Sequence, residues 1–96
     1  MTTKEELFEK KSIIKEIAKK HGAYDIRIFG SVARGDDRGD SDIDFLVKTK
    51  KKTSSWFPGG LIADLEDILG RKVEVVTEKG LNSLIRDQVL GDATPL

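Results

Sequence analysis

Apolar residues near the start of the chain recur at the three- and four-residue spacings of an amphipathic helix. Lysines and glutamates fill most of the positions between them, and the apolar set is Leu7, Phe8, Ile14, Ile17 and Ala18. We therefore predict one helix over Lys4–Lys20. Thr3 and Glu6 have the spacing of a capping box, and His21-Gly22 is a typical helix end. We expect His21 to interact with the helix dipole and assign it no chemistry.

Three short runs have the composition of β-strands: Tyr24–Phe29, Asp42–Val47 and Val73–Val76. The second run alternates between polar and apolar residues. Because side chains on a strand alternate between its two faces, Asp42 and Asp44 project from one side. The opposite side then carries only apolar residues, which are Ile43, Phe45 and Val47.

Helical segments are predicted between and after these strands. They are a single turn at Ser31–Asp36, a helix at Leu61–Leu69 closed by Gly70, and a last helix at Asn82–Leu90. We expect the tail from Asp92 to Leu96 to be loose unless a partner holds it. This α-β-α-β-α-β-α order predicts an α/β fold with a small mixed β-sheet flanked by helices, as one domain over residues 1–96.

Composition narrows the function classes. The 96 residues include 17 Lys and Arg, 17 Asp and Glu, and no Cys. A balanced charge gives no general attraction to nucleic acid, so we expect no direct nucleic-acid binding. The absence of cysteine excludes thiolate metal sites and is compatible with a reducing cytoplasm. No apolar leader or membrane-length run is present, which predicts a cytoplasmic protein without membrane contact.

The two aspartates at the start of the second strand suggest a metal site. Asp42 and Asp44 share one face, and two carboxylates held that close repel unless a cation lies between them. Mg²⁺ takes oxygen ligands and often uses only one or two protein carboxylates, with water and substrate phosphates completing its shell. Gly30-Ser31 ends the first strand, and such a corner suits a phosphate, because glycine permits close approach and serine offers a hydroxyl.

These residues together resemble a known family. Gly30-Ser31, ten further residues and then Asp42-Ile43-Asp44 resemble the signature of the DNA polymerase beta superfamily of nucleotidyltransferases. GSVARG followed by SDIDFLV is similar to the minimal nucleotidyltransferases, which are paired with HEPN-domain ribonuclease toxins. The resemblance implies a polymerase beta-like fold, Mg²⁺, ATP as donor, and transfer of AMP to a tyrosine of a cognate HEPN toxin in a hetero-oligomer. The toxin would thereby be silenced.

Glu74 lies within the valine-rich third strand, where a buried carboxylate is costly unless it is paired or metal-bound. One interpretation is an edge strand with Glu74 facing water, or paired with Arg71 or Lys72. The resemblance implies instead the third metal-site carboxylate, with Asp42 and Asp44 as the other two catalytic residues. The family usually has aspartate here, so the longer side chain leaves open whether Glu74 supports full activity.

Arg34 within GSVARG also has two interpretations: a surface ion pair with Asp36 or Asp37, or a contact to a nucleotide phosphate. The resemblance favours the second and implies that Gly30, Ser31 and Arg34 bind the nucleotide.

Two remaining stretches are ambiguous. We expect Lys48, Lys50, Lys51 and Lys52 to be solvated, with a role in holding a polyanion or an acidic partner surface as the alternative. We expect Trp56 and Phe57 to pack their loop over the sheet, with an exposed partner surface as the alternative. An alternative function also remains, a non-catalytic antitoxin that inhibits the HEPN toxin by binding and occlusion.

Overall fold

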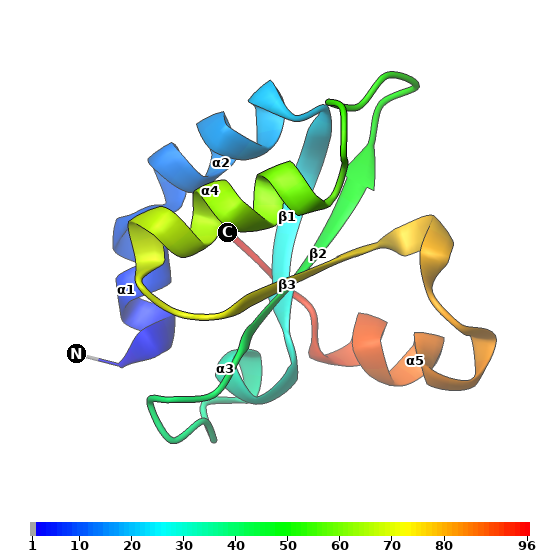
Figure 1. The fold of residues 1–96 in the computed structure, drawn as a ribbon. Coiled ribbons are helices and arrows are strands. Elements are labelled where there is room, and N and C mark those ends of the chain that lie inside the picture. The colour runs from blue at the N-terminus through cyan, green and yellow to red at the C-terminus, as the bar shows by residue number, and fades with distance from the viewer. Residues whose placement is uncertain (1) are drawn as a thin grey trace.

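A four-stranded mixed sheet with the strand order β3-β2-β1-β4 forms the centre of the molecule (Figure 1). The structure is a computed structural model and describes residues 2–96. β1 (Ala23–Phe29) runs antiparallel to β2 (Ile43–Thr49), and β2 runs parallel to β3 (Val73–Thr77). The predicted α/β fold with a small mixed sheet is therefore confirmed.

The N-terminal helical region consists of two helices instead of the one that we predicted. α1 (Thr3–Glu9) and α2 (Lys11–Lys20) meet at Lys10, where the chain turns. The cap is Thr2 instead of Thr3: its hydroxyl accepts from the Glu5 amide at 3.1 Å, and the Glu5 carboxylate accepts from the Thr2 amide at 3.2 Å. The one-residue shift leaves the Thr3 hydroxyl free to bond elsewhere.

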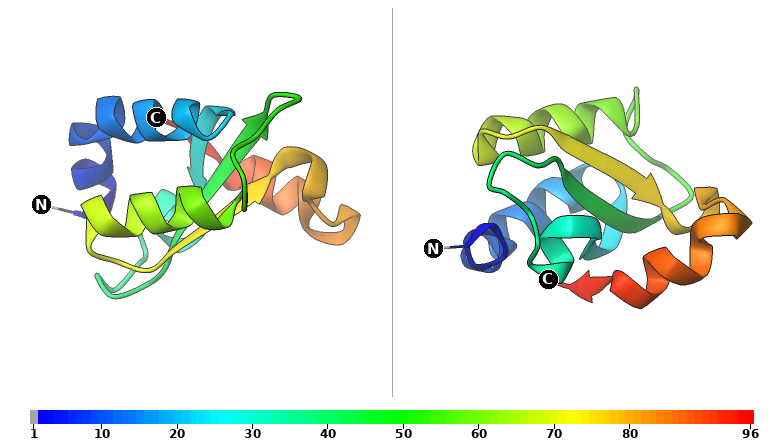
Figure 2. Two further views of the ribbon diagram at one scale, coloured as in Figure 1. Left: turned by 45° about the horizontal axis from the view of Figure 1, so that its top comes forward. Right: turned by 90° about the horizontal axis from the view of Figure 1, so that it is seen from below.

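The main core lies between the sheet and the helices on one of its faces. α2 and α4 (Gly59–Leu69) cover this face (Figure 2). Gly70 closes α4 in the left-handed conformation, as its sequence predicts. The alternation predicted for β2 is confirmed, because its apolar side chains on this face are fully buried: Ile43, Phe45 and Val47.

The opposite face of the sheet is only partly covered. α3 (Gly30–Arg34) follows β1 directly, and α5 (Ser83–Asp92) crosses below the sheet (Figure 2). Leu46 and Val89 are buried but lie outside the main core cluster. Since Leu46 and Asp44 are two residues apart on β2, they project from this same face. It therefore combines a small apolar patch with the predicted acidic positions.

The C-terminal tail is ordered, and our prediction of a loose tail is wrong. Thr94–Pro95 forms β4, which pairs antiparallel with β1 at Ile28 and Arg27. The Leu96 amide also donates to the Ile26 carbonyl at 3.0 Å. β4 is an edge strand, and proline is tolerated at a sheet edge because its missing N–H removes no required ladder bond.

The loop before α4 differs from expectation at one residue. Trp56 is 89% exposed, so it does not pack over the sheet, whereas Phe57 packs against the core as predicted. Lys50, Lys51 and Lys52 are solvent-exposed as expected, and Lys48 approaches the Asp25 carboxylate at 3.4 Å. No helix within residues 2–96 is long and apolar enough to cross a membrane.

His21 has a more specific structural role than a dipole interaction. It caps the end of α2, and its buried ring lies between two polar groups: Nδ1 is 2.6 Å from Ser54 Oγ and Nε2 is 2.7 Å from Asp64 Oδ2. The ring thereby ties α2 to the loop before α4 and to α4 itself.

Candidate functional site

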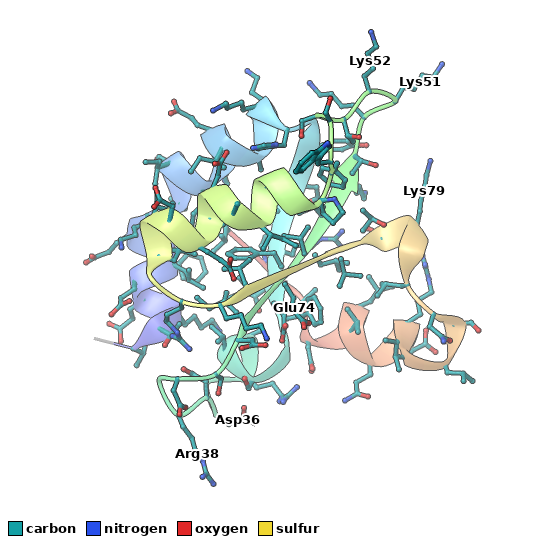
Figure 3. The ribbon with its side chains drawn as sticks, viewed as in Figure 1. Asp36, Arg38, Lys51, Lys52, Glu74 and Lys79 are labelled. Carbon is teal, nitrogen blue, oxygen red and sulfur yellow. The ribbon has the colours of Figure 1, made fainter. Side chains whose placement is uncertain are left out.

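Asp44 and Glu74 face each other on neighbouring strands. The parallel register pairs Asp44 of β2 with Glu74 of β3. Paired residues project from the same face, so the two carboxylates lie side by side on the partly covered side of the sheet. β3 is an edge strand and Glu74 is solvent-exposed, as one of the two sequence interpretations expected (Figure 3). Glu74 is therefore both exposed to solvent and close to Asp44.

The electrostatics of Asp44 reflect this crowding. Burial, together with the negative charges of Glu74 and Asp42, raises the pKa of Asp44 to about 6. Arg34 opposes this shift, which indicates that its positive charge is felt at Asp44. A pair of carboxyl groups in contact needs either a shared proton or a nearby cation. The site is thus built to hold positive charge.

The Asp44 carboxylate packs against Gly30, where a larger residue would leave it no space. Gly30 adopts φ +74°, and a β-carbon built at this position would come within 2.5 Å of Asp44 Oδ2. The register explains the contact, because Phe29 at the end of β1 pairs with Asp44. Only glycine combines this backbone conformation with this approach. Ser31 follows in the first turn of α3, so the glycine of the glycine-serine corner lies against the Asp44 carboxylate.

Asp42 immediately precedes β2 and is half-buried. Its charge reaches Asp44, so all three predicted acids belong to one electrostatic cluster. Within residues 2–96, however, no three acidic, histidine or cysteine side chains converge into a ready metal-ligand group. The oxygen donors are of the type that Mg²⁺ prefers, and cation binding would relieve the repulsion among them.

Arg34 makes two ion pairs in this structure. Its Nε is 3.2 Å from Asp36 Oδ2, which is one of the contacts that the sequence allowed. Its Nη1 is 2.7 Å from Asp92 Oδ2, at the end of α5. These carboxylates raise the pKa of Arg34. Sequence reasoning missed Asp92, because nothing local predicts that a residue 58 positions away folds back onto α3.

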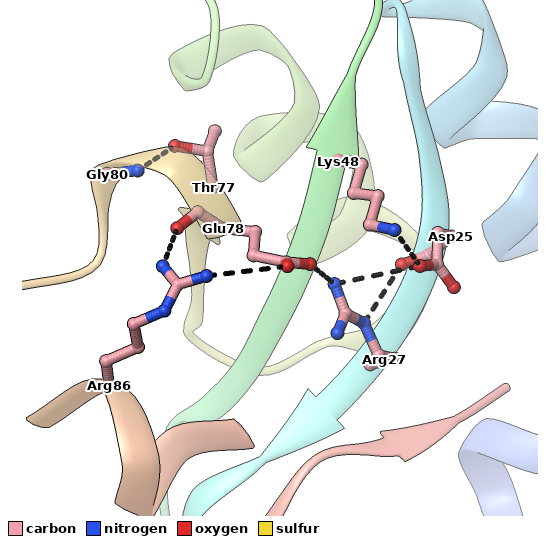
Figure 4. Close-up of polar contacts among 7 residues, drawn as sticks. All are labelled: Asp25, Arg27, Lys48, Thr77, Glu78, Gly80 and Arg86. Atoms are coloured by element: carbon pink, nitrogen blue, oxygen red, sulfur yellow. Dashed lines mark hydrogen bonds and ion pairs between the residues drawn. The ribbon is translucent and has the colours of Figure 1, made fainter.

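A second polar network lies on the same face of the sheet, further along the strands (Figure 4). Arg27 donates to Glu78 at 2.5 Å and faces Leu46 in the register, two residues beyond Asp44. Glu78 begins the short helix η1 (Glu78–Gly80), and Arg86 of α5 donates to its carbonyl at 3.3 Å. The bond from Arg27 lowers the pKa of Glu78. This network, also missed from the sequence, links α5 to the sheet through Glu78.

The fold and the site can be compared with known proteins. A family model described as the nucleotidyltransferase domain matches residues 10–94. The chain belongs to this nucleotidyltransferase family. A solved structure described as a minimal nucleotidyltransferase has 40% identity and a TM-score of 0.85, and the match covers 100% of this chain and 97% of the other. The resemblance inferred from GSVARG and SDIDFLV is thus confirmed.

Two relatives carry more specific names. The protein adenylyltransferase MntA of Thermococcus cleftensis is 37% identical over 76 residues, covering 79% of this nucleotidyltransferase and 77% of the relative. MJ0435 of Methanocaldococcus jannaschii, named as a candidate protein adenylyltransferase, is 38% identical over 74 residues, covering 77% and 80%.

A more distant solved structure shares the fold. It is described as a toxin-antitoxin with AMP-PNP, and it has 19% identity and a TM-score of 0.69, with 97% of this nucleotidyltransferase and 71% of the other chain covered. At this identity the likeness concerns the fold alone.

Proposed function

We propose that this nucleotidyltransferase, acting as a single minimal domain, transfers AMP from ATP to a tyrosine of a cognate HEPN ribonuclease toxin and thereby neutralises it. The observation that carries the proposal is the Asp44–Glu74 pair, held against Gly30 at the glycine-serine corner. The adenylyltransferase names of two relatives support AMP transfer as the reaction.

Each predicted residue has a role in this reaction. Asp42, Asp44 and Glu74 would hold Mg²⁺, which supplies charge neutralisation for the transferred phosphoryl group. The Gly30 backbone would lie beside the phosphates, Ser31 would offer its hydroxyl to them, and Arg34 would add positive charge. Glu74, the exposed member of the acidic set, would accept the proton of the attacking hydroxyl.

The bond changes follow from these roles. The acceptor oxygen forms a bond to the α-phosphorus of ATP, the bond from that phosphorus to the bridging oxygen breaks, and pyrophosphate leaves. The acceptor proton passes to the Glu74 carboxylate. For this to proceed, Arg34 must turn at least partly from Asp36 and Asp92 toward the phosphates, because both carboxylates occupy its guanidinium in this structure.

Intact-mass spectrometry of the partner tests the proposal. The partner is incubated with this protein, ATP and Mg²⁺, and we expect its mass to rise by one or more AMP units. Asp42→Ala combined with Asp44→Ala should abolish the gain. Glu74→Gln should lower the rate by a factor on the order of 10² to 10⁴, the usual contribution of a general base. Transfer that persists in the double variant would refute the site assignment.

A non-catalytic antitoxin is the second candidate. Two observations favour it: no three acidic side chains converge within residues 2–96, and Arg34 is engaged by two carboxylates. In that case the double alanine variant neutralises the toxin as well as the wild type does, and the toxin carries no covalent mark.

A further inference from the structure

Arg71 lies in the turn between α4 and β3 and joins three separate segments. Its side chain is 16% exposed. Nη1 donates to the Thr3 hydroxyl of α1 at 2.6 Å, and Nη2 donates to the Ser41 carbonyl. A guanidinium serves two acceptors in different directions at once, which a lysine ammonium on a flexible stem does less well. Arg71 thus links the start of α1 to the end of the Asp36–Ser41 loop.

The same junction also anchors the beginning of that loop. The Thr3 hydroxyl donates to Asp37 Oδ2 at 2.9 Å, and Arg71 Nη2 lies 4.0 Å from the same oxygen. The Asp37 side chain is only 9% exposed. The Gly39 amide donates to Asp37 Oδ2 at 3.3 Å. The loop is therefore attached to Thr3 and Arg71 near both of its ends.

Asp42 is held between two consecutive residues of the turn. On one side, Arg71 bonds to the carbonyl of Ser41, the residue immediately before Asp42. On the other side, the Ile43 amide donates to the Lys72 carbonyl at 3.0 Å, where the parallel pairing of β2 with β3 begins. Fixing the peptide groups on both sides of Asp42 limits the directions in which its carboxylate can point.

One buried atom shows that this arrangement has a cost. Within residues 2–96, Arg71 Nε is buried and has no hydrogen-bond partner. An unsatisfied buried donor is unfavourable, and native proteins have few of them. The two terminal nitrogens of the guanidinium therefore bond to Thr3 and Ser41 at the cost of leaving Nε without a hydrogen bond.

We propose that Arg71 is a positioning residue that orients Asp42 for metal and nucleotide, with Thr3 and Asp37 as its partners. The part of this proposal that concerns catalysis rests on the proposed function, whereas the ordering of the loop does not. The Asp36–Ser41 loop is then held by side chains of the protein before any metal arrives.

Two variants test the proposal without removing the core. Arg71→Lys keeps the charge but loses the two-acceptor geometry, and Thr3→Val removes only the hydroxyl. Hydrogen–deuterium exchange is measured for amides 37–42, and Mn²⁺ affinity is measured by electron paramagnetic resonance. We expect loop exchange in Arg71→Lys to rise by roughly tenfold and Mn²⁺ affinity to fall by about 10- to 100-fold, as for other residues that orient metal ligands. Thr3→Val should show smaller changes in the same direction.

Arg38→Ala is the matched control, because Arg38 is in the same loop and points away from the junction into solvent (Figure 3). It should leave both readouts unchanged. Equal Mn²⁺ affinity in Arg71→Lys and wild type overturns the proposal, and so does a loss of protection spread evenly over the core strands. A wild-type protein that binds no Mn²⁺ contradicts the proposed function instead. In that case, hydrogen–deuterium exchange in the loop still tests whether Arg71 orders the Asp36–Ser41 loop.

Discussion

The Asp44 carboxylate lies against the backbone of Gly30, so closely that a β-carbon at position 30 would meet Asp44 Oδ2 at 2.5 Å. This contact joins the corner that follows β1 to the acidic position on β2. It makes the glycine a structural requirement of the site.

Gly30→Ala is therefore expected to lower both the free energy of unfolding and the activity. The positive φ costs roughly 1 kcal/mol for alanine, and the clash displaces the Asp44 carboxylate in addition. Gly35→Ala separates these effects, because Gly35 has φ +79° but a β-carbon added there would have no neighbouring atom within 4 Å. Urea unfolding should show a larger loss for Gly30→Ala than for Gly35→Ala. Equal losses would mean that the contact with Asp44 is unimportant.

The raised pKa of Asp44 predicts a dependence of stability on pH. With the pKa raised to about 6, the folded state retains a proton that the unfolded chain releases above its ordinary value near 3.8. The free energy of unfolding therefore falls as pH rises from about 4 to about 6, and the full penalty is present above that range. Because the group is only half-buried, solvent screening reduces the penalty to about 1–2 kcal/mol.

Asp44→Asn should remove this pH-dependent penalty. Its stability relative to wild type is expected to increase between about pH 4 and about pH 6, as measured by urea unfolding across that range. Mg²⁺ should stabilise the wild type more at about pH 7 than at about pH 4.5, because the cation favours ionised carboxylates. A difference between the two proteins that does not change with pH would argue against the crowding of Asp44, Asp42 and Glu74.

The ion pair between Arg34 and Asp92 predicts competition with the nucleotide. Asp92→Asn removes the carboxylate that lies 2.7 Å from the guanidinium. If Arg34 binds phosphate, KM for ATP should fall by about two- to fivefold, the size of a surface ion pair. Arg34→Ala should raise KM in both backgrounds. An Asp92→Asn change that acts equally with and without Arg34 would show that the two residues do not interact during binding.

The C-terminal strand predicts a stability effect of the tail. Deleting residues 94–96 removes the pairing with β1 and the bond from the Leu96 amide to the Ile26 carbonyl. We expect the free energy of unfolding to fall by about 1–3 kcal/mol, since each lost hydrogen bond contributes roughly 0.5–1.5 kcal/mol. Thr94→Ala keeps the backbone bonds and serves as the control. A truncated protein as stable as the full chain would mean that β4 contributes nothing in solution.

Sequence patterns predicted most of the helices and strands, because these elements are determined largely by residues that are close together in the sequence. The period of two in β2 and the glycine that ends α4 depend on neighbours in sequence, and both were confirmed. The turn at Lys10 was missed because the apolar spacing on either side fits one continuous helix. β4 was missed because two residues carry too little pattern to predict a strand, and its pairing depends on where α5 delivers the chain.

The site shows the same division. Only the family resemblance predicted that Asp44 and Glu74 lie close together. The strand order that places them side by side cannot be predicted from the local sequence of either strand. The partners of Arg34 and Arg71 lie on distant segments, so charge pattern alone could not identify Asp92 or Ser41. Sequence supplied the chemical groups, and tertiary structure decided which of them are in contact.

Radiolabelled ATP tests the central claim most directly. The partner toxin is incubated with this protein, Mg²⁺ and ATP that carries the label at either the α- or the γ-phosphorus, and label on the toxin is measured after denaturing electrophoresis. We predict label from the α-position, none from the γ-position, and loss of the α-label in Asp44→Asn. Label from the γ-position, or α-label that survives Asp44→Asn, would contradict AMP transfer by this acidic site.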